Sequence, residues 1–516
     1  IWWSEMRPLE AGRVQLVRRA PPGETEDVLP GDQSARTRVH EYGGGAWTVH
    51  RGIVFYSAWA DQRLHRLVPG EEPVPISPAD EPGALRYADH VVSDDGRWVV
   101  SIREDHRPGG EAVNEIVAVA SDGSAEQVLV SGPDFVSFPR LSPDGRTLAW
   151  TQWDHPRMPW DGTELWVAEF DAARGAVSRA RRVAGGPTES LFQPEWSPDG
   201  VLHVVSDRSD WWNLHRFPAP GPPAPGDPLV PLAPIDAEVG TPQWVFAMSR
   251  YAFVGDGRIL CAYAADGTDH VGLVEPGGGG LVPLDLAYTA VTSVRPGPEP
   301  GTAVAIAAAP TAEPAVVLLT TDGGVEVLRP PRDLGLDPDL LSAPEPVDFT
   351  SGGGREAHAL FYPPTNPGAV GPPDERPPLL VLIHGGPTAA ARPQLQLGTQ
   401  FWTSRGFAVV DVNYGGSVGY GRPYRDRLDG QWGVVDVEDC VAAARPLAET
   451  GRVDPARLAI RGGSAGGYTT LAALAFHDLF SAGASQYGVA DLSALAADTH
   501  KFESRYLDGL VGPWPE

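Results

Sequence analysis

A repeat with a period near 50 residues constrains the fold of this chain more than any other feature of its sequence. Six turns, four of them Asp-Gly, are each followed by a short alternating apolar run, and their glycines lie 44, 49, 55, 57 and 44 residues apart. These glycines are Gly52, Gly96, Gly145, Gly200, Gly257 and Gly301. Glycine takes the positive φ of a tight hairpin turn at no steric cost. The pattern therefore predicts a series of antiparallel hairpins.

A period of this length is typical of the four-stranded blade of a β-propeller, in which each blade buries its faces against its neighbours. Residues 1–4 and 14–17 have the same apolar pattern, which corresponds to a repeat that begins just after its turn glycine. The prediction is an all-β propeller of seven blades over residues 1–335, with the first blade incomplete. A pair of β-sandwiches is the alternative, and the sustained period argues against it.

The pattern changes after a proline-containing linker at residues 329–343. From there on, strand-like and helix-like segments alternate, which predicts a mostly parallel sheet covered on both faces by helices. The expected strands are residues 346–350, 357–362, 379–383, 407–413, 458–461 and 482–487, with a helix at 435–449. Residues 336–516 are therefore predicted to form a second domain, of the α/β class.

The second domain contains the stretch Leu458-Ala-Ile-Arg-Gly-Gly-Ser464-Ala-Gly-Gly-Tyr468, which matches the pattern G-x-S-x-G. An apolar strand leads into it, and residues 465–476 have the small and apolar composition of a packed helix. On so sharp a turn a β-carbon at Gly462 or Gly466 would collide with the chain. Ser464 is therefore the candidate nucleophile, although a glycine-rich loop between a strand and a helix could have the same composition.

A second glycine pair ends the strand at 379–383, in Leu379-Leu-Val-Leu-Ile-His384-Gly-Gly-Pro387. In an α/β-hydrolase this position supplies the second backbone donor to the oxyanion of acyl transfer. The two glycine-rich turns together favour a hydrolase over a plain structural loop.

Composition disfavours several classes of function. A chain of 516 residues exceeds the usual limit of one core, which agrees with two domains. The net charge of −27 argues against nucleic acid or an anionic membrane as a partner, because both attract basic surfaces. Cys261 and Cys440 fall in different domains and no signal or membrane-spanning segment is evident, so we expect a reducing, cytoplasmic location. No metal ion or other cofactor is predicted.

Three stretches of the propeller combine carboxylates, basic groups and tryptophans next to strand ends. They are residues 40–47, 153–160 and 207–213. This composition suits a face that holds a polar ligand, and blade-to-blade packing would explain it equally well. Both interpretations stay open at the level of the sequence.

A seven-bladed propeller followed by a domain with His-Gly-Gly-Pro and Gly-Gly-Ser-Ala-Gly-Gly resembles the prolyl oligopeptidase family of serine peptidases. The resemblance is nearest to its acylaminoacyl-peptidase and dipeptidyl-aminopeptidase-like branch. It implies Ser464 as the nucleophile and the backbone N–H groups of Ala465 and Gly386 as the oxyanion hole. It also implies that His384 is not a catalytic base, because the branch with His-Gly-Gly-Pro uses a backbone donor where relatives with tyrosine at this position use its hydroxyl.

The resemblance further implies where the side chain of the substrate binds. In the family, the segment after the strand that follows the nucleophile forms one wall of the pocket for the residue before the scissile bond. In this chain that segment contains Leu492, Leu495 and Phe502, at roughly helical spacing. A plain helix core would show the same spacing.

The remaining catalytic residues are not found. Only 52 residues follow Ser464, and their two histidines, His477 and His500, do not lie where a triad histidine belongs. We therefore expect the chain to be a fragment whose hydrolase domain is incomplete at its C-terminus, with the triad Asp and His beyond residue 516. Three functions stay open, namely a serine peptidase acting on short peptides, a non-catalytic propeller binding protein, and an esterase on the same scaffold. A homo-oligomer also stays open.

Overall fold

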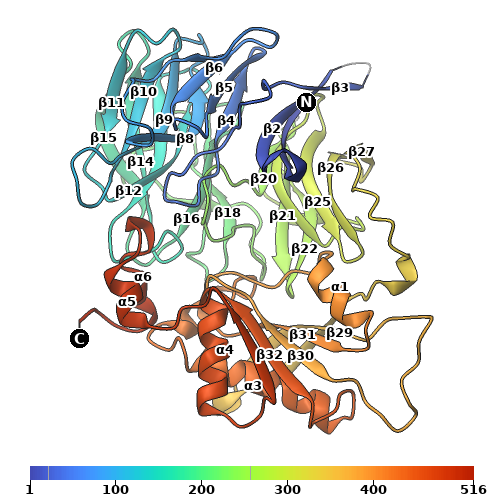
Figure 1. Cartoon of the computed structure of the whole chain (residues 1–516). Helices are drawn as coiled ribbons and strands as arrows, with labels where there is room; N and C mark the ends of the chain where they lie inside the picture. Colours follow the sequence, from blue (N-terminus) through green and yellow to red (C-terminus); the bar gives the residue numbers. More distant parts are fainter. Residues whose placement is uncertain (21–22, 256, 516) are drawn as a thin grey trace.

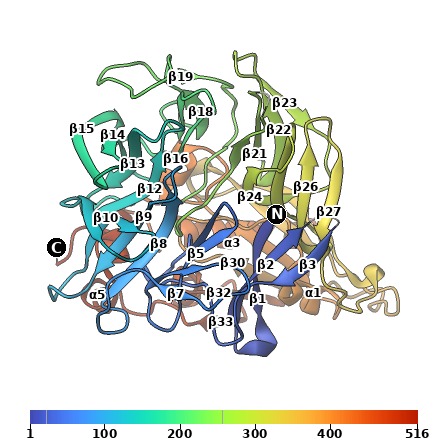
Figure 2. The same cartoon turned by 90° about the horizontal axis from the view of Figure 1, so that it is seen from above.

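The computed structural model describes residues 1–20, 23–255 and 257–515, which form a propeller stacked on an α/β domain (Figure 1). Within these ranges the propeller has seven small antiparallel sheets arranged in a ring, and Figure 2 views it from above. The prediction of a seven-bladed propeller followed by an α/β-hydrolase region is confirmed. Asp256, which belongs to the fifth predicted turn, lies outside the described residues.

The blades follow one another along the chain. The first has β1 (Trp2–Arg7), β2 (Arg13–Ala20) and β3 (Glu24–Asp27); the second has β4 (Trp47–His50), β5 (Ile53–Ser57), β6 (Leu64–Leu67) and β7 (Val74–Pro75); the third has β8 (Leu85–Val92), β9 (Trp98–Asp105), β10 (Val113–Ala120) and β11 (Glu126–Val130). The fourth has β12 (Phe135–Leu141), β13 (Thr147–Trp153), β14 (Glu164–Asp171) and β15 (Ala176–Gly185), and the fifth has β16 (Leu191–Trp196), β17 (Leu202–Ser206), β18 (Asn213–Arg216) and β19 (Val230–Pro231). The sixth has β20 (Tyr251–Phe253), β21 (Ile259–Ala265), β22 (Thr268–Val274) and β23 (Leu281–Leu284), and the seventh has β24 (Ala290–Pro296), β25 (Thr302–Ala309), β26 (Ala312–Thr320) and β27 (Val325–Arg329).

The first strand of several blades carries a bulge at the same place. Asp89, Phe138, Gln193 and Ser293 have φ of 50°, 50°, 48° and 55°, and in each strand the pairing register shifts there. Two of these bulge residues also link successive blades: the Asp89 carboxylate accepts a hydrogen bond from the Phe138 N–H at 3.1 Å, and the Gln193 side chain accepts one from the Arg250 N–H at 2.7 Å. A bulge bends a strand and re-aims its groups. Here it joins one blade to the next.

The α/β domain is built on a six-stranded sheet within the described residues, in the order β28-β29-β31-β30-β32-β33. Its strands are β28 (Glu345–Thr350), β29 (Glu356–Tyr362), β30 (Leu379–Ile383), β31 (Ala408–Asn413), β32 (Leu458–Gly463) and β33 (Ala482–Gln486). Strands β30 to β33 pair in parallel, whereas β28 and β29 are antiparallel to their neighbours. The predicted strands are therefore present, with ends that differ by at most two residues.

Helices cover both faces of this sheet. The helices of the domain are α1 (Leu397–Thr403), α2 (Arg422–Arg425), α3 (Val435–Glu449), α4 (Ala465–Phe476), α5 (Leu492–Ala497) and α6 (Tyr506–Leu510). Helices α3 and α4 share one apolar core with the sheet, and α1 packs through Trp402 on a separate cluster with Leu360 and Val409. Figure 1 shows α5 and α6 reaching from the α/β domain toward β12 of the propeller. In the described ranges, no helix combines the length and apolar character needed to cross a membrane.

Candidate active site

Ser464 stands on the sharp turn between β32 and α4, where the sequence predicts a nucleophile elbow. Its backbone has φ 54° and ψ −122°, and its side chain is exposed. A serine at this φ and ψ lies outside the regions that L-residues favour, and such strain at a site is held by the surrounding structure. The turn therefore presents the Ser464 hydroxyl at the carboxyl end of β32.

The neighbouring glycines are required by close approach of the chain. A β-carbon on Gly462 would lie 2.2 Å from the carbonyl oxygen of Gly466, so the predicted collision within the turn is found there. A β-carbon on Gly466 would instead lie 2.6 Å from the carbonyl oxygen of Ile383. At Gly466 the obstacle is therefore the end of β30 and not the turn itself.

The loop after β30 lies beside the elbow. A β-carbon on Gly385 would be 3.5 Å from the β-carbon of Ser464, and the next residue, Gly386, has φ 120°. Ala465 is the first residue of α4, where a backbone N–H has no acceptor within the helix and the helix dipole favours negative charge. The two predicted oxyanion donors, Gly386 and Ala465, thus lie on the two segments that border Ser464.

His384 is engaged on both ring nitrogens. Its Nδ1 donates to the carbonyl of Gly385 at 2.8 Å, and its Nε2 accepts from the Ser417 hydroxyl at 2.8 Å. The ring stacks on Tyr414 with centroids 4.4 Å apart, and burial lowers its pKa from 6.5 to about 4. The ring is neutral near pH 7 and both nitrogens are occupied, which agrees with a structural role.

A general base does not contact Ser464 in the part of the chain that the structure describes, where the Ser464 hydroxyl has no hydrogen-bond partner. His477 caps the far end of α4. His500 lies 3.6 Å from a carboxylate oxygen of Glu503, with its ring 5.4 Å from that of Tyr42. Among the described residues, no group of three or more His, Cys, Asp or Glu side chains could hold a metal ion.

The three predicted pocket residues lie against one apolar core but differ in exposure. Leu492 and Leu495, on α5, are half-buried and pack against that core. Phe502 is 1% exposed, and its ring lies among rings of the propeller, 4.9 Å from His40 and 5.8 Å from Phe135. The contact of Phe502 with the propeller was not predicted from the sequence.

The three polar and aromatic stretches of the propeller all take part in contacts with the α/β domain. Residues 40–47 and 153–160 border Phe502, through side chains that include His40 and Trp160. In the third stretch, Trp212 lies under the guanidinium of Arg425, 4.2 Å from the ring centroid. Contact between domains therefore explains part of each stretch, an interpretation that the sequence did not suggest.

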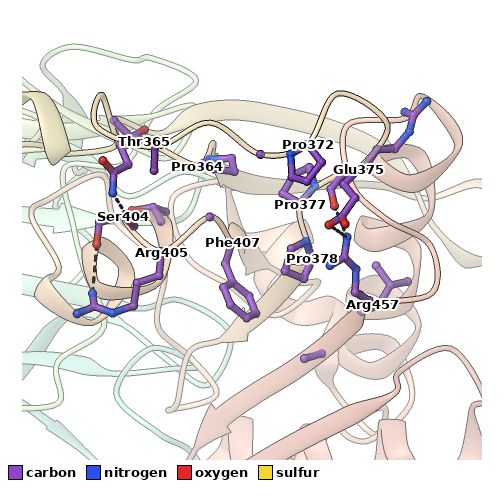
Figure 3. Close-up of a pocket in the computed structure, with 18 of the residues that line it drawn as sticks. Pro364, Thr365, Pro372, Glu375, Pro377, Pro378, Ser404, Arg405, Phe407 and Arg457 are labelled. Atoms are coloured by element: carbon purple, nitrogen blue, oxygen red, sulfur yellow. Dashed lines mark hydrogen bonds and ion pairs between the residues drawn. The ribbon is translucent and has the colours of Figure 1, made fainter.

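One pocket of the α/β domain lies away from Ser464. It has a volume of about 1100 Å³ and is lined by residues such as Pro364, Pro378, Phe407 and Arg457 (Figure 3). These residues surround the amino ends of β30, β31 and β32, whereas Ser464 follows the carboxyl end of β32. Ligands of open α/β sheets bind outside the carboxyl ends of the strands. This pocket is therefore not the candidate active site.

Comparison with known proteins agrees with this geometry. The model of the prolyl oligopeptidase family matches residues 393–516. The chain is 32% identical over 142 residues to dipeptidyl aminopeptidase BIII of Pseudoxanthomonas mexicana, covering 27% of this chain and 21% of the relative. It is also 32% identical over 123 residues to the acylamino-acid-releasing enzyme of Arabidopsis thaliana, covering 24% of this chain and 16% of the relative. These alignments span about a fifth of the length of the curated relatives.

Solved structures match over nearly the whole chain. A puromycin hydrolase superposes with a TM-score of 0.93 and 41% identity, covering 99% of this chain and 80% of that one. A puromycin-hydrolyzing peptidase of Mycobacterium tuberculosis has a TM-score of 0.93 and 42% identity, covering 100% of this chain and 80% of that one. With two-fifths of its residues identical over four-fifths of these proteins, and with the elbow and the glycine pair placed as described, the chain belongs to the prolyl oligopeptidase family.

Proposed function

We propose that the whole protein is a serine peptidase that hydrolyses short peptides by acyl transfer to Ser464. The strained elbow carries this proposal, because it presents an exposed hydroxyl beside two segments with backbone donors. The Ser464 oxygen attacks the peptide carbonyl and loses its proton to a base. The N–H groups of Ala465 and Gly386 bind the oxyanion, the base returns the proton to the leaving amine, and water hydrolyses the acyl-enzyme and restores the Ser464 hydroxyl.

The choice of short peptides is supported by the relatives. One solved neighbour with 41% identity is described as a puromycin hydrolase variant complexed with PGG, and curated relatives are named as dipeptidyl and acylamino-acid-releasing enzymes. We propose that Leu492 and Leu495 form the wall of an apolar pocket for the side chain before the cleaved bond, with the buried Phe502 fixing that wall against the propeller. We further propose a cytoplasmic location, in keeping with two buried and unpaired cysteines.

A non-catalytic binding protein is the second candidate, favoured by one observation: in the described part of the chain Ser464 has no base beside it. Reaction of the whole protein with a fluorophosphonate, followed by mass spectrometry, separates the two. Labelling of Ser464 together with turnover of an aminoacyl or dipeptidyl anilide supports the peptidase. An unlabelled Ser464 and absent turnover would support the binding protein. Turnover of esters without amides would identify an esterase.

A further inference from the structure

Two loops of the propeller meet across its axis at the end that faces the α/β domain. Residues 40–47 lead into β4 and residues 241–249 lead into β20. Gly44 and Phe246 form a parallel bridge, and the Phe246 N–H donates to the carbonyl of Gly43 at 2.9 Å. Strands β4 and β20 belong to the second and sixth blades, which are not neighbours in the ring. We call residues 40–47 and 241–249 the axial plug.

The axial plug is held by the first strands of the surrounding blades. The bonds are Asp89 N–H to the Gly45 carbonyl at 2.8 Å, Gln243 to Ser137, Gln193 to Ser249 at 3.1 Å, and Arg295 to the Ala247 carbonyl at 2.5 Å. Its backbone is strained, because His40 and Glu41 have φ of 55° and 64°. A β-carbon on Gly44 would lie 2.6 Å from backbone atoms of Phe246. Such conformations persist only where the surroundings fix them, and they gather at functional sites.

Trp244 connects the axial plug to the loop after β30. Its indole N–H donates to the carbonyl of Thr388 at 2.8 Å, and Thr388 is two residues after Gly386. The Thr388 N–H in turn donates to the Tyr506 hydroxyl at 3.1 Å, and the two hydroxyls are 2.5 Å apart. The Tyr414 hydroxyl donates to the Pro387 carbonyl at 3.2 Å. Three aromatic side chains therefore fix the polar groups that directly follow Gly386.

We propose that Trp244 is a positioning residue for the oxyanion hole, through which the propeller sets the orientation of the Gly386 N–H. The proposal rests on the proposed function. Gly386 lies at φ 120°, a conformation that glycine leaves readily, so its orientation depends on its neighbours. An oxyanion donor is effective only when it is fixed before the reaction, and a displacement of about 1 Å can cost on the order of a hundredfold in rate. Trp244 acts through Thr388 and not by contact with the substrate.

The substitution Trp244→Phe tests this directly in the whole protein. It keeps an aromatic ring beside Trp160 and Tyr506, whose centroids lie 4.6 and 5.8 Å from that of Trp244, and removes the indole N–H together with part of the bicyclic ring, a loss of volume that Trp150→Phe shares. The expected result is a fall in kcat of about tenfold with KM changed by less than about twofold, because an oxyanion donor acts in the transition state. The amide hydrogens of residues 384–386 and 388 should also exchange faster.

Trp150→Phe is the matched control. It likewise removes a buried indole donor, which bonds to Gln152 at 2.9 Å within β13, away from the domain contact. It should lower Tm and leave kcat unchanged. Wild-type kcat in Trp244→Phe, or an equal loss in Trp150→Phe, would overturn the proposal.

A second variant reaches Thr388 only through the plug. Gly44→Ala should displace Phe246 and lower kcat as Trp244→Phe does. In the double variant, kcat should fall by less than the product of the two single losses, because both substitutions act on one contact. Fully multiplicative losses would contradict the mechanism. If Ser464 of the wild type is not labelled by a fluorophosphonate, the proposed function fails. The hydrogen exchange of residues 384–386 and 388 still decides the positioning role, because unchanged exchange in Trp244→Phe refutes it whatever the activity.

Discussion

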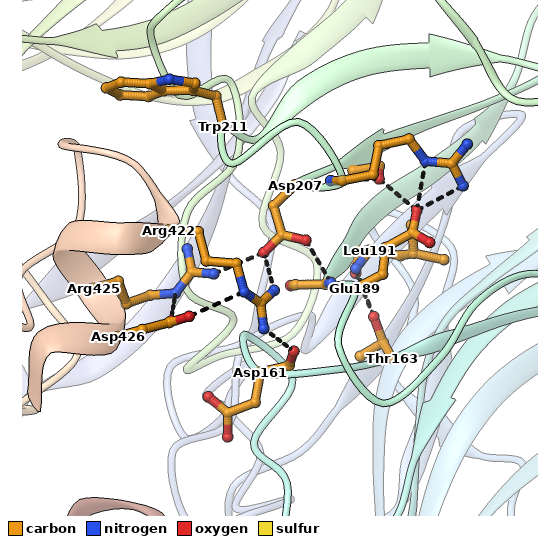
Figure 4. A network of polar contacts seen from close by, with 12 residues as sticks. Asp161, Thr163, Glu189, Leu191, Asp207, Trp211, Arg422, Arg425 and Asp426 are labelled. Atoms are coloured by element: carbon orange, nitrogen blue, oxygen red, sulfur yellow. Dashed lines mark hydrogen bonds and ion pairs between the residues drawn. The ribbon is translucent and has the colours of Figure 1, made fainter. Parts of the chain in front are cut away.

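Two of the regions in which the propeller and the α/β domain meet have opposite chemistry. In the charged region, Asp207 of the propeller lies between Arg422 and Arg425 of the α/β domain, 2.5 and 2.7 Å from their guanidinium nitrogens (Figure 4). In the aromatic region, Phe502 and Tyr506 lie among rings of the propeller that include Trp160 and Trp244. Both regions are buried, yet their energetics differ.

The charged region fixes how the domains are oriented. The side chains of Asp207 and Arg425 are 1% and 3% exposed, and the Glu238 carboxylate accepts the Gly419 N–H at 2.6 Å. A buried ion pair contributes little net stability, because desolvation offsets its attraction, but breaking it leaves an uncompensated charge. A displaced arrangement of the two domains would separate the ion pair and leave its charges buried without partners, so this region favours one orientation of the domains.

The aromatic region bears on chemistry. In this region the propeller reaches the loop that carries Gly386 through the bond from Trp244 to Thr388. Substitutions in the charged region should therefore change stability, and substitutions in the aromatic region should change kcat.

The largest effect should come from Ser464→Ala, which defines complete loss of activity for the comparison. In the whole protein, kcat should fall by roughly 10⁴-fold or more while Tm stays within a few degrees, because the hydroxyl is exposed and bonded to nothing in the described residues. Steady-state hydrolysis of a peptide anilide and thermal unfolding measure both. Retained turnover would place the nucleophile elsewhere.

Breaking the charged region should have the next largest effect. Asp207→Ala leaves Arg422 and Arg425 without the buried carboxylate between them, and should lower the free energy of unfolding by about 3–5 kcal/mol. Asp426→Ala is the control, because its carboxylate is 41% exposed and 3.2 Å from the same Arg422, so about 0–1 kcal/mol is expected. Urea unfolding of both variants measures the two losses in the free energy of unfolding. Equal losses would show that burial does not distinguish the two pairs.

The sequence could predict the parts of the molecule that depend on local patterns. The blades follow from turn glycines, and Ser464 with its strand and helix follows from a short motif. The helix Val435–Glu449 has the bounds that its residues predict. These elements are fixed by interactions within a few tens of residues.

The two contact regions could not be predicted in the same way. Asp207 and Arg422 are 215 residues apart, and Trp244 and Thr388 are 144 apart. These pairs form only when the folded domains pack against each other, and no periodicity in the sequence indicates which residues then come into contact. The tryptophans and carboxylates of residues 40–47 and 207–213 were the available signal, and it could not separate ligand binding from domain contact.

Substituting the predicted pocket should give a smaller effect, confined to the substrate. Leu492→Asp should lower kcat/KM by roughly 10- to 100-fold for peptides with an apolar side chain before the cleaved bond, because an unpaired carboxylate is costly in an apolar pocket. Leu336→Asp, at a leucine that is 45% exposed in the linker, should leave kcat/KM unchanged. The comparison uses peptides that differ only at that side chain. A wild-type preference for Asp or Glu there would refute the pocket assignment.

The smallest effect should come from the seam that closes the propeller ring, which is charged like the first region but lies near the surface. Glu326 of β27 pairs with Arg19 of β2 at 2.9 Å, with side chains 54% and 23% exposed. Water screens such a pair, so Glu326→Ala should cost only about 0.2–1 kcal/mol in the free energy of unfolding. The loss should shrink further near 1 M salt, where the screening length is about 3 Å. Urea unfolding at low and high salt checks both statements. A loss near that of Asp207→Ala, insensitive to salt, would show that side-chain exposure does not determine how much these two charged contacts contribute to the free energy of unfolding.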